Sequence, residues 1–469
     1  MKKLSLIIFT LFFSLLATAQ KDSNKVYLDV GDAKVKKSLL AMPAFLYFGS
    51  GKTNSTHIRY GTEIFETIKQ NMEVSSYFTF VKPDAFLEDT SKAKLKPKTL
   101  EEGGFDFKSW SAIGTDFLIK AGYSVSGSTV KLEIYAYSVK QMKLIFGRTY
   151  SAKASDLRQI AHTFSDDFIE ALTGKKGMYR SKIAVTVSTK AGQKEIFVMD
   201  WDGKNRKQIS KFKNISISPA WSPDAKKVAY TSFAYHPKAK VRNADLFEYD
   251  LETGKTFMIS SKKGINSGAA YHPNGEELYF SISENGAPDI YIYDRKTEKR
   301  RKFTDGPLGA MNVEPAVSPD GKLVAYSSDR SGKQPMVYLK KAGSSPKAKP
   351  KRLTFAGRYN STPAWSPDGK LIAFSGHKDG HFDIYLLNVE TKRIFKKLTS
   401  AKKRVGNTNK WANNESPTFS PDGRFVMFTS DRYGPHQLFI VDVHGKNIER
   451  RITNDNKNYE KPKWSKLLD

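Results

Sequence analysis

The sequence contains no cysteine. This absence excludes disulfide bonds, thiolate metal sites and a cysteine nucleophile, and it also excludes the lipid anchor that exported lipoproteins carry on an N-terminal cysteine. Beyond residue 19 there is no apolar run of about 18 residues, the length that a membrane-crossing helix needs. We therefore expect the remaining chain to be soluble and to meet membranes only through partners.

Signatures of catalysis are also missing. The segment 122–126 lacks the last glycine of a Gly-x-Ser-x-Gly nucleophile elbow. The segment 49–53 resembles the end of a phosphate-binding loop, but Leu46 stands where that motif needs its first glycine. His377 and His381 flank an Asp-Gly turn instead of sharing a helix face, so we expect no zinc there. The sequence predicts a protein that is not an enzyme and has neither cofactor nor metal.

Acidic residues are few relative to basic ones. Lys and Arg number 77 against 48 Asp and Glu, giving a formal net charge of +29. The lysines are scattered, without the interleaved aromatic residues on which nucleic-acid bases would stack. We expect a solvated basic surface that favours anionic envelope partners, and no nucleic-acid binding.

The N-terminus has the pattern of a cleavable signal peptide. Lys2 and Lys3 precede the apolar run 4–16, and Ala17-Thr-Ala19 supplies a small-x-small cleavage site. We expect cleavage after Ala19, so that residues 1–19 are the signal, Gln20 begins the mature chain, and the protein is exported to the periplasm.

A motif of the form Ser-Pro-Asp-Gly recurs through the second part of the chain. Its clearest copy spans residues 361–375, and a large side chain just before each turn marks the register. The spacing of these register residues, 45 to 54 positions, is typical of a β-propeller built from four-stranded blades. The register residues are Trp221, Tyr271, Val317, Trp365, Phe419 and Trp464.

The two ends of the repeat region complement each other. It begins at 182–187 with a segment of the second-strand type, followed by 195–199 and 207–209 as third and fourth strands. The missing first strand is 460–464, at the other end of the chain. We predict a six-bladed propeller over 177–469, closed by three N-terminal strands and one C-terminal strand, which removes the free edges of an open array.

Residues 20–176 lack the repeat and predict a small α/β domain. Strands are expected at 26–30, 40–48 and 130–137, among others, because apolar residues alternate there or run together. A helix is expected within 61–72. A second helix is expected over 155–172, with Ser155 or Asp156 as its cap and Gly174 as its end.

The loops that lead into the innermost strands ring the mouth of a propeller channel. Here they are rich in asparagine and glutamate, for example at 265–267, 311–314 and 413–416. Such side chains suit hydrogen bonding to a partner, so we interpret this end as a binding face. The residues alone leave open whether the partner is a protein or a glycan, and they leave a hydrolase with paired carboxylates as a third possibility.

Several segments resemble the TolB family of the Tol–Pal system. They are 160–162 with 172–174 and 182–184 across the domain junction, 360–369, 415–423 and 461–465. The resemblance covers essentially the whole mature chain, in the order signal, small α/β domain and closed six-bladed propeller. It implies a non-enzymatic, monomeric periplasmic adaptor that acts in outer-membrane constriction during division and in envelope integrity.

The resemblance also implies two partner sites. A Pal-like peptidoglycan-associated lipoprotein would dock at the channel mouth, on Asn266, Asn312, Glu314, Asn360, Glu415 and Glu460. A TolA-like inner-membrane protein would bind the mature N-terminal segment 20–37, including Val26, Tyr27, Asp29 and Asp32. An exported propeller lectin or glycan-binding module is the alternative.

Overall fold

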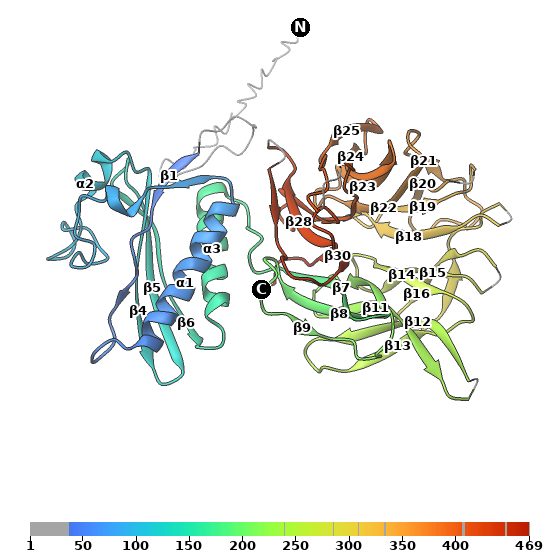
Figure 1. Cartoon of the computed structure of the whole chain (residues 1–469), viewed down its shortest axis with the longest axis horizontal. Coiled ribbons are helices and arrows are strands. Elements are labelled where there is room, and N and C mark those ends of the chain that lie inside the picture. The colour runs from blue at the N-terminus through green and yellow to red at the C-terminus, as the bar shows by residue number, and fades with distance from the viewer. Residues whose placement is uncertain are drawn as a thin grey trace, which may run out of the picture.

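The computed structural model describes residues 37–468, apart from 239, 285, 308, 333, 406–408 and 446–447. It consists of an α/β unit beside a β-propeller (Figure 1). The predicted signal peptide, the predicted strand 26–30, and Val26, Tyr27, Asp29 and Asp32 lie outside the described residues. Within the described part, no helix has the length and apolarity to cross a membrane.

The α/β unit is built on one mixed sheet in the order β3-β1-β4-β5-β6, with β2 paired to β4. Sequence analysis predicts one strand over 40–48, but the structure has two short ones interrupted around Pro43, which has no backbone N–H to give to a ladder. The strands are β1 (Ser38–Ala41), β2 (Leu46–Tyr47), β3 (Phe78–Phe80), β4 (Phe117–Ser126), β5 (Thr129–Ser138) and β6 (Lys143–Lys153).

Two helices, α1 (Ser55–Val74) and α3 (Leu157–Thr173), pack together against this sheet (Figure 1). The α1 helix begins earlier than its apolar spacing predicts, because Asn54 caps it by accepting the His57 N–H at 2.9 Å. Asp156 takes the cap position of α3 but forms no side-chain capping bond. Gly174 ends α3 as predicted, in a left-handed conformation with φ of 70°.

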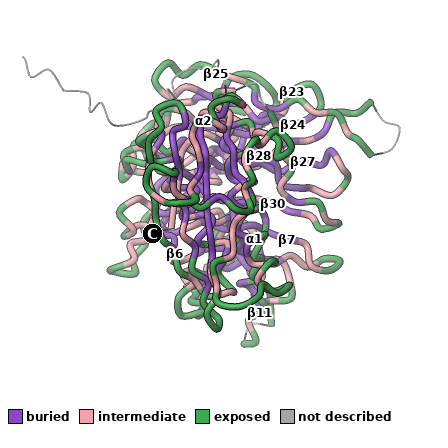
Figure 2. The backbone as a smooth tube through the Cα atoms, turned by 90° about the vertical axis from the view of Figure 1, so that its left-hand side faces the viewer, coloured by how far each residue is buried: buried purple, intermediate pink, exposed green. Residues whose placement is uncertain are grey.

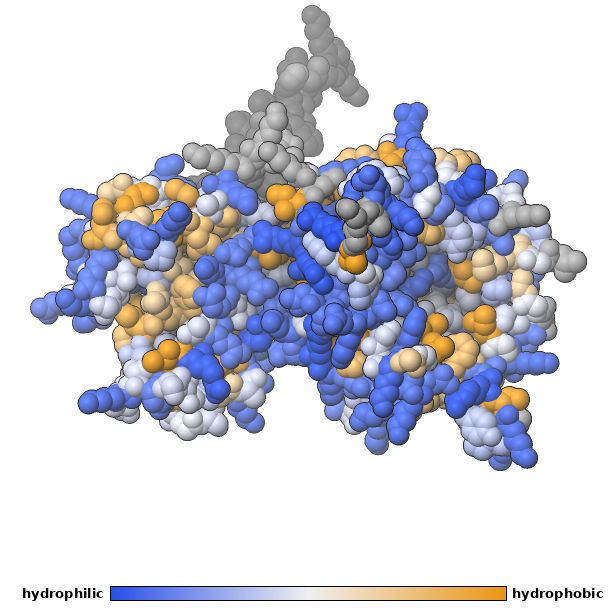
Figure 3. Space-filling model, viewed as in Figure 1, coloured by the Kyte–Doolittle hydropathy of each residue, from blue (hydrophilic) through white to orange (hydrophobic). Residues whose placement is uncertain are grey.

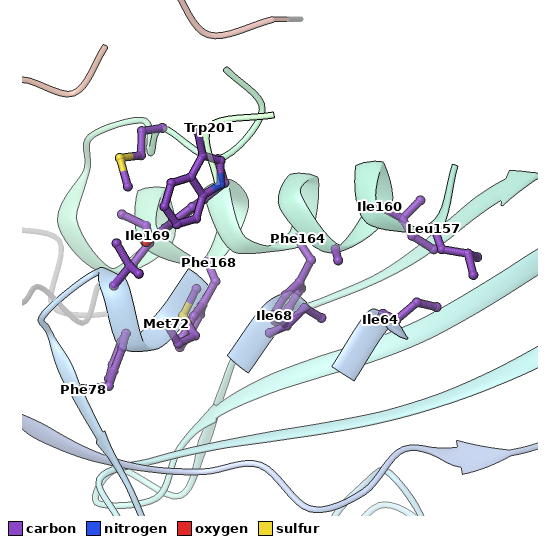
Figure 4. Close-up of a cluster of buried hydrophobic side chains, with 14 of the residues drawn as sticks. Ile64, Ile68, Met72, Phe78, Leu157, Ile160, Phe164, Phe168, Ile169 and Trp201 are labelled. Atoms are coloured by element: carbon purple, nitrogen blue, oxygen red, sulfur yellow. The ribbon is translucent and has the colours of Figure 1, made fainter. Parts of the chain in front are cut away.

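Short helical segments complete the unit, namely the 3₁₀ turn η1 (Pro83–Ala85) and α2 (Phe107–Ala112). The core between the long helices consists of apolar side chains at helical spacing (Figure 4). Ile64, Ile68 and Met72 of α1 face Phe164 and Phe168 of α3, and all five are fully buried. This amphipathic packing, more than helix propensity, holds the two helices on the sheet.

The second unit is a six-bladed propeller of four-stranded antiparallel sheets. We number the blades 1 to 6 by their first strands β10, β14, β18, β22, β26 and β30. Blades 1 to 3 consist of β10 (Ser216–Trp221), β11 (Lys227–His236), β12 (Val241–Asp250), β13 (Thr256–Ser260); β14 (Asn266–Tyr271), β15 (Glu277–Ile282), β16 (Asp289–Asp294), β17 (Arg300–Lys302); and β18 (Asn312–Val317), β19 (Leu323–Ser328), β20 (Met336–Lys341), β21 (Lys351–Arg352). Blades 4 and 5 consist of β22 (Tyr359–Trp365), β23 (Leu371–Lys378), β24 (His381–Asn388), β25 (Arg393–Lys397); and β26 (Asn414–Phe419), β27 (Phe425–Ser430), β28 (Gln437–Asp442), β29 (Glu449–Arg451).

Blade 6 joins the two ends of the propeller. Its sheet has the order β30-β7-β8-β9, which is the arrangement that the repeat register predicts. Trp464 lies opposite Ile183 in the ladder, and its indole donates to the Ser181 hydroxyl at 2.6 Å. The strands are β30 (Tyr459–Trp464), β7 (Lys182–Lys190), β8 (Gln193–Asp200) and β9 (Lys207–Gln208).

The recurring Ser-Pro-Asp motif forms the same turn between first and second strands. In blade 4 the Ser366 hydroxyl donates to Asp368 at 2.6 Å and accepts the Leu371 N–H at 2.9 Å. Blades 1, 3 and 5 repeat both bonds within 2.5–3.0 Å. The motif therefore recurs because blades 1, 3, 4 and 5 share the same closed hairpin between their first and second strands.

The two units share one hydrophobic core, which includes Trp201 and Tyr179 together with residues of α1 and α3. Tyr179 donates its hydroxyl to the Asn71 carbonyl at 2.8 Å, and Arg450 donates to the Glu73 carbonyl at 2.8 Å. Buried residues concentrate in strands and helices, and exposed ones in the connecting loops (Figure 2). Arg424, in the turn between the first and second strands of blade 5, also donates to the Ser75 carbonyl. Among the described residues, these contacts of the α/β unit with the propeller lie on blades 5 and 6, away from the loops that lead into the first strands.

Candidate protein-binding site at the mouth of the propeller channel

The first strands of all six blades share one backbone feature where they line the channel. Each first strand carries a residue with φ between 51° and 69° at the same position, and its ladder register slips there as a β-bulge. Proline follows in five of the six strands, which the structure tolerates because these are edge strands. The bulge residues are Ser218, Gly268, Glu314, Thr362, Ser416 and Lys461, and we call this ring the channel waist.

An ion pair spans the waist. Glu314 in blade 3 lies 2.6 Å from the ammonium of Lys461 in blade 6, the blade on the opposite side of the ring. The second Glu314 oxygen accepts the Ser327 hydroxyl at 3.0 Å and the Thr362 N–H at 2.9 Å. Burial raises the pKa of Glu314, but Lys461 and these hydrogen bonds outweigh it, so the pKa is lowered.

The asparagines that the resemblance places in the partner site are buried. Asn266 and Asn312 have no exposed surface, and Asn360 is 3% exposed. The Asn266 amide donates to the carbonyls of Ala244 and Lys262 at 2.9 and 2.7 Å. Its oxygen accepts the Ser260 hydroxyl at 2.7 Å. In this structure such asparagines satisfy the backbone of the loops that lead to the mouth.

The same arrangement recurs around the ring. Asn312 donates to Asp289 at 2.8 Å, and Asn360 donates to the Ala356 carbonyl at 2.8 Å. Asn414, a position that the sequence reasoning did not single out, donates to Asp383 at 3.0 Å and accepts from Arg432 at 2.9 Å. The recurrence of asparagine at or next to the start of four of the six first strands was a visible signal of this structural role.

The carboxylates at the mouth are more accessible. Glu415 and Glu460 expose 36% and 34% of their side chains. Glu460 binds the Lys194 ammonium at 2.7 Å, and Glu415 lies 3.8 Å from the His436 imidazole. Partial burial raises the pKa of Glu415, and this effect outweighs the opposing charges of His436 and Lys461.

Exposed apolar side chains stand in the same loops, a feature that the sequence reasoning missed. Ile265, Phe355, Tyr359 and Trp411 are 46%, 71%, 37% and 40% exposed, and each lies shortly before or at the start of a first strand. The Trp411 ring stacks on His381 at 5.1 Å. The propeller surface in view is mostly hydrophilic, and a broader apolar area lies over the α/β unit (Figure 3). We call these four side chains the mouth ring, because all four expose apolar surface in the loops that lead into first strands.

The two histidines of the Asp-Gly turn contact neighbouring side chains of the propeller. His381 pairs with Asp383 at 2.9 Å, whereas His377 packs edge-on against Phe382. Over the described ranges, no group of three or more acidic or histidine side chains has an arrangement suited to a metal ion.

Comparison with known families agrees with this architecture. Residues 169–406 and 360–467 match the family described as TolB beta propeller domain, and residues 27–144 match the TolB amino-terminal domain. The chain belongs to the TolB family. Both parts of the molecule are therefore accounted for by one family, in the order that the sequence predicts.

Individual TolB relatives match the chain over only part of its length. The chain is 32% identical over 264 residues to a TolB homolog of Chlorobium chlorochromatii, covering 56% of each protein. It is 40% identical over 166 residues to the Tol-Pal system protein TolB of Geobacter metallireducens, covering 35% of this chain and 37% of that one. The matched regions thus span between about a third and two thirds of the curated relatives' length.

The fold has a solved counterpart. The structure of TolB from Acinetobacter baumannii superposes with a TM-score of 0.73 at 24% identity, covering 94% of this chain and all of that one. The fold class, a small α/β domain followed by a six-bladed propeller, is confirmed.

Proposed function

We propose that this chain is a non-enzymatic periplasmic adaptor of a Tol–Pal system, which joins a Pal-like outer-membrane lipoprotein to the inner-membrane Tol complex. The observation that carries the proposal is the mouth ring, a set of exposed apolar side chains in the same first-strand loops as the accessible carboxylates Glu415 and Glu460. This role would serve outer-membrane invagination during division and envelope integrity, in keeping with relatives named as Tol-Pal system proteins.

The mouth has the composition of a protein-binding surface. Aromatic anchors with a polar rim are typical of the residues that dominate binding energy. Phe355 and Trp411 would supply the anchors, and Glu415 and Glu460 would supply rim contacts to donors of the lipoprotein. The buried Asn266, Asn312 and Asn360 would then act indirectly, by holding the loops, while Glu314 would contribute from within the channel.

The second partner site remains a proposal from the family. Residues 20–37, with Val26, Tyr27, Asp29 and Asp32, would contact a TolA-like protein after export and removal of residues 1–19. The remaining domain boundaries, 20–176 and 177–469, are also proposals. They are supported by α3 ending at Thr173 and β7 beginning at Lys182.

The test uses mature protein (20–469) and purified Pal-type lipoprotein from the same cell, with affinity measured by calorimetry. Phe355→Ser should weaken binding by about 1–3 kcal/mol, because it removes an exposed aromatic contact. Glu415→Ala should weaken it by a similar ~1–3 kcal/mol. Phe395→Ser is the matched control, since Phe395 is 54% exposed on the outer strand β25.

Two outcomes would overturn the proposal. Equal affinity for wild type, Phe355→Ser and Glu415→Ala would remove the mouth from the partner site. Retention of purified glycan with no binding of any Pal-type lipoprotein would favour the lectin alternative.

A further inference from the structure

Two lysines and one glutamate line the cavity at the channel waist, namely Lys461, Lys463 and Glu314. Glu415, next to the waist residue Ser416, also interacts with Lys461. Glu314 already binds Lys461 at 2.6 Å and uses its other oxygen for Ser327 and Thr362. Among the residues that the structure describes, Lys463 has no carboxylate partner. Within the described part of the chain, Lys463 is therefore the waist lysine that forms no ion pair, whereas Lys461 pairs with Glu314.

Hydroxyl groups flank this cation. Lys461 and Lys463 lie on β30, and the neighbouring first strands β26 and β10 bring Ser416 and Ser218 to the waist. Within the described part of the chain, neither serine hydroxyl bonds to another group, whereas the Thr362 hydroxyl is engaged with Ser375 at 2.7 Å. Two free O–H donors thus accompany one free ammonium, which is a donor set suited to an anion.

The space available limits the size of that anion. The cavity at the waist measures about 40 Å³, room for roughly three water molecules. Its walls are otherwise apolar, with prolines such as Pro315, Pro363 and Pro417. A nucleotide or a sugar is too large, but a single carboxylate group fits.

We propose that the waist is a binding site for a small monovalent anion of the carboxylate class, held by the Lys463 ammonium and the Ser218 and Ser416 hydroxyls. This site lies inside the channel and does not depend on the proposed partner at the mouth. Free formate or acetate and a carboxylate side chain of a protein share the required chemistry.

The pKa of Lys463 gives anion binding a proton-linked signature that can be measured. Burial, and next the charge of Lys461, lower the pKa of Lys463 to about 8, against a smaller opposing effect of Glu314. The waist residues from the four remaining first strands, Ser218, Gly268, Thr362 and Ser416, are uncharged. An anion beside Lys463 would stabilise its charged form, so binding near pH 8 should take up about half a proton.

The experiment titrates the mature chain with sodium formate against sodium gluconate at constant ionic strength. Gluconate is the control anion because its carboxylate is attached directly to a hydroxylated carbon chain, which is bulkier than the CH₂ group that carries an Asp or Glu carboxylate. Binding is followed by calorimetry, and by the fluorescence of Trp221, whose indole donates to the Lys463 carbonyl at 2.9 Å. Calorimetry in two buffers with different ionisation enthalpies, at pH 6 and pH 8, measures the proton uptake.

The matched variants are Lys463→Met and Lys466→Met, which change the net charge equally, since Lys466 is an exposed residue just after β30. We expect wild type and Lys466→Met to bind formate and not gluconate, and Lys463→Met to lose about tenfold to hundredfold in affinity. Uptake of protons at pH 8 but not at pH 6 should accompany binding. Absence of formate binding to wild type, or equal binding by Lys463→Met, would overturn the proposal.

A competition experiment identifies the source of the carboxylate. If formate competes with a Pal-type lipoprotein for wild type but not for Lys463→Met, the natural occupant is a side chain of the partner. If formate binds without affecting the partner, the occupant is a free anion. If the wild-type protein binds formate but binds no Pal-type lipoprotein, the proposed function is contradicted and the anion site is not.

Discussion

Glu314 and Lys461 form an ion pair across the propeller channel, with 2.6 Å between their charged atoms, although 147 positions separate them in the sequence. Lys461 belongs to β30, the C-terminal strand that completes blade 6, and Glu314 belongs to blade 3. The pair therefore connects the strand that closes the ring to its opposite side. The ion pair therefore stabilises the position of β30 in the closed ring, in addition to the backbone hydrogen bonds between β30 and β7.

Removing this pair should destabilise the propeller. Glu314→Gln should lower the free energy of unfolding by about 1–3 kcal/mol, because it leaves Lys461 without its carboxylate in the channel. The double variant Glu314→Gln/Lys461→Met should lose less than the two single variants together. Chemical denaturation of all four proteins checks this, and strictly additive losses would show that the two residues are not coupled.

The interface between the two units depends on Arg158. This α3 residue lies 3.4 Å from Asp200 and also binds Asp202, and both carboxylate side chains are at most 4% exposed. Arg158→Met should therefore cost about 3 kcal/mol, because buried carboxylates would remain without this partner.

The matched control is Arg148→Met. Arg148 is 59% exposed and pairs with Asp167 at 2.6 Å, so its loss should cost about 1 kcal/mol or less. Denaturation and limited proteolysis between 173 and 181 measure both effects. Equal stability of the two variants would show that Arg158 does not hold the interface.

Lys120 should make the stability of the α/β unit pH-dependent. Its side chain is 2% exposed and lies 3.9 Å from Glu88. Burial lowers its pKa to about 8, although Glu88 opposes the shift. Because the folded pKa is below the unfolded value of about 10.4, the folded state gains relative stability as pH rises from 8 to 10.4, by roughly 3 kcal/mol, and loses it again as pH falls through 8.

The difference in unfolding free energy between wild type and Lys120→Met isolates this effect. The difference should shift in favour of wild type between pH 7.5 and 10, whereas Lys131→Met, an exposed lysine on the adjacent strand β5, should track wild type. A pH-independent difference for Lys120→Met would contradict the assignment.

Asn266 should contribute to the stability of the fold, because its side chain bonds to buried loop groups. Asn266→Ala removes bonds to Ala244, Lys262 and Ser260 and should cost about 1–3 kcal/mol in unfolding free energy. Ile265→Ala, one residue earlier and 46% exposed, should stay within about 0.5 kcal/mol of wild type. Thermal unfolding distinguishes the two variants. An Asn266→Ala variant as stable as wild type would contradict this structural role and favour direct contact with the partner.

The sequence by itself determined the repeat architecture and the number of blades. The Ser-Pro-Asp turn is a local structure, stabilised by bonds within six residues such as Ser366 to Asp368 and Leu371, so its recurrence is visible without the fold. Gly174 likewise ended α3 as predicted, because a left-handed helix end is a local requirement.

Only the tertiary structure decided which side chains of the mouth are accessible. Asn266 and Ile265 are adjacent in the sequence, yet the polar one is fully buried and the apolar one is 46% exposed. Asn266 is buried because its amide donates to backbone carbonyls of Ala244 and Lys262, and these carbonyls come within its reach only in the folded loop. The Glu314–Lys461 pair and the unpaired Lys463 similarly arise from six strands that meet only when the ring closes, so their chemistry belongs to the folded molecule.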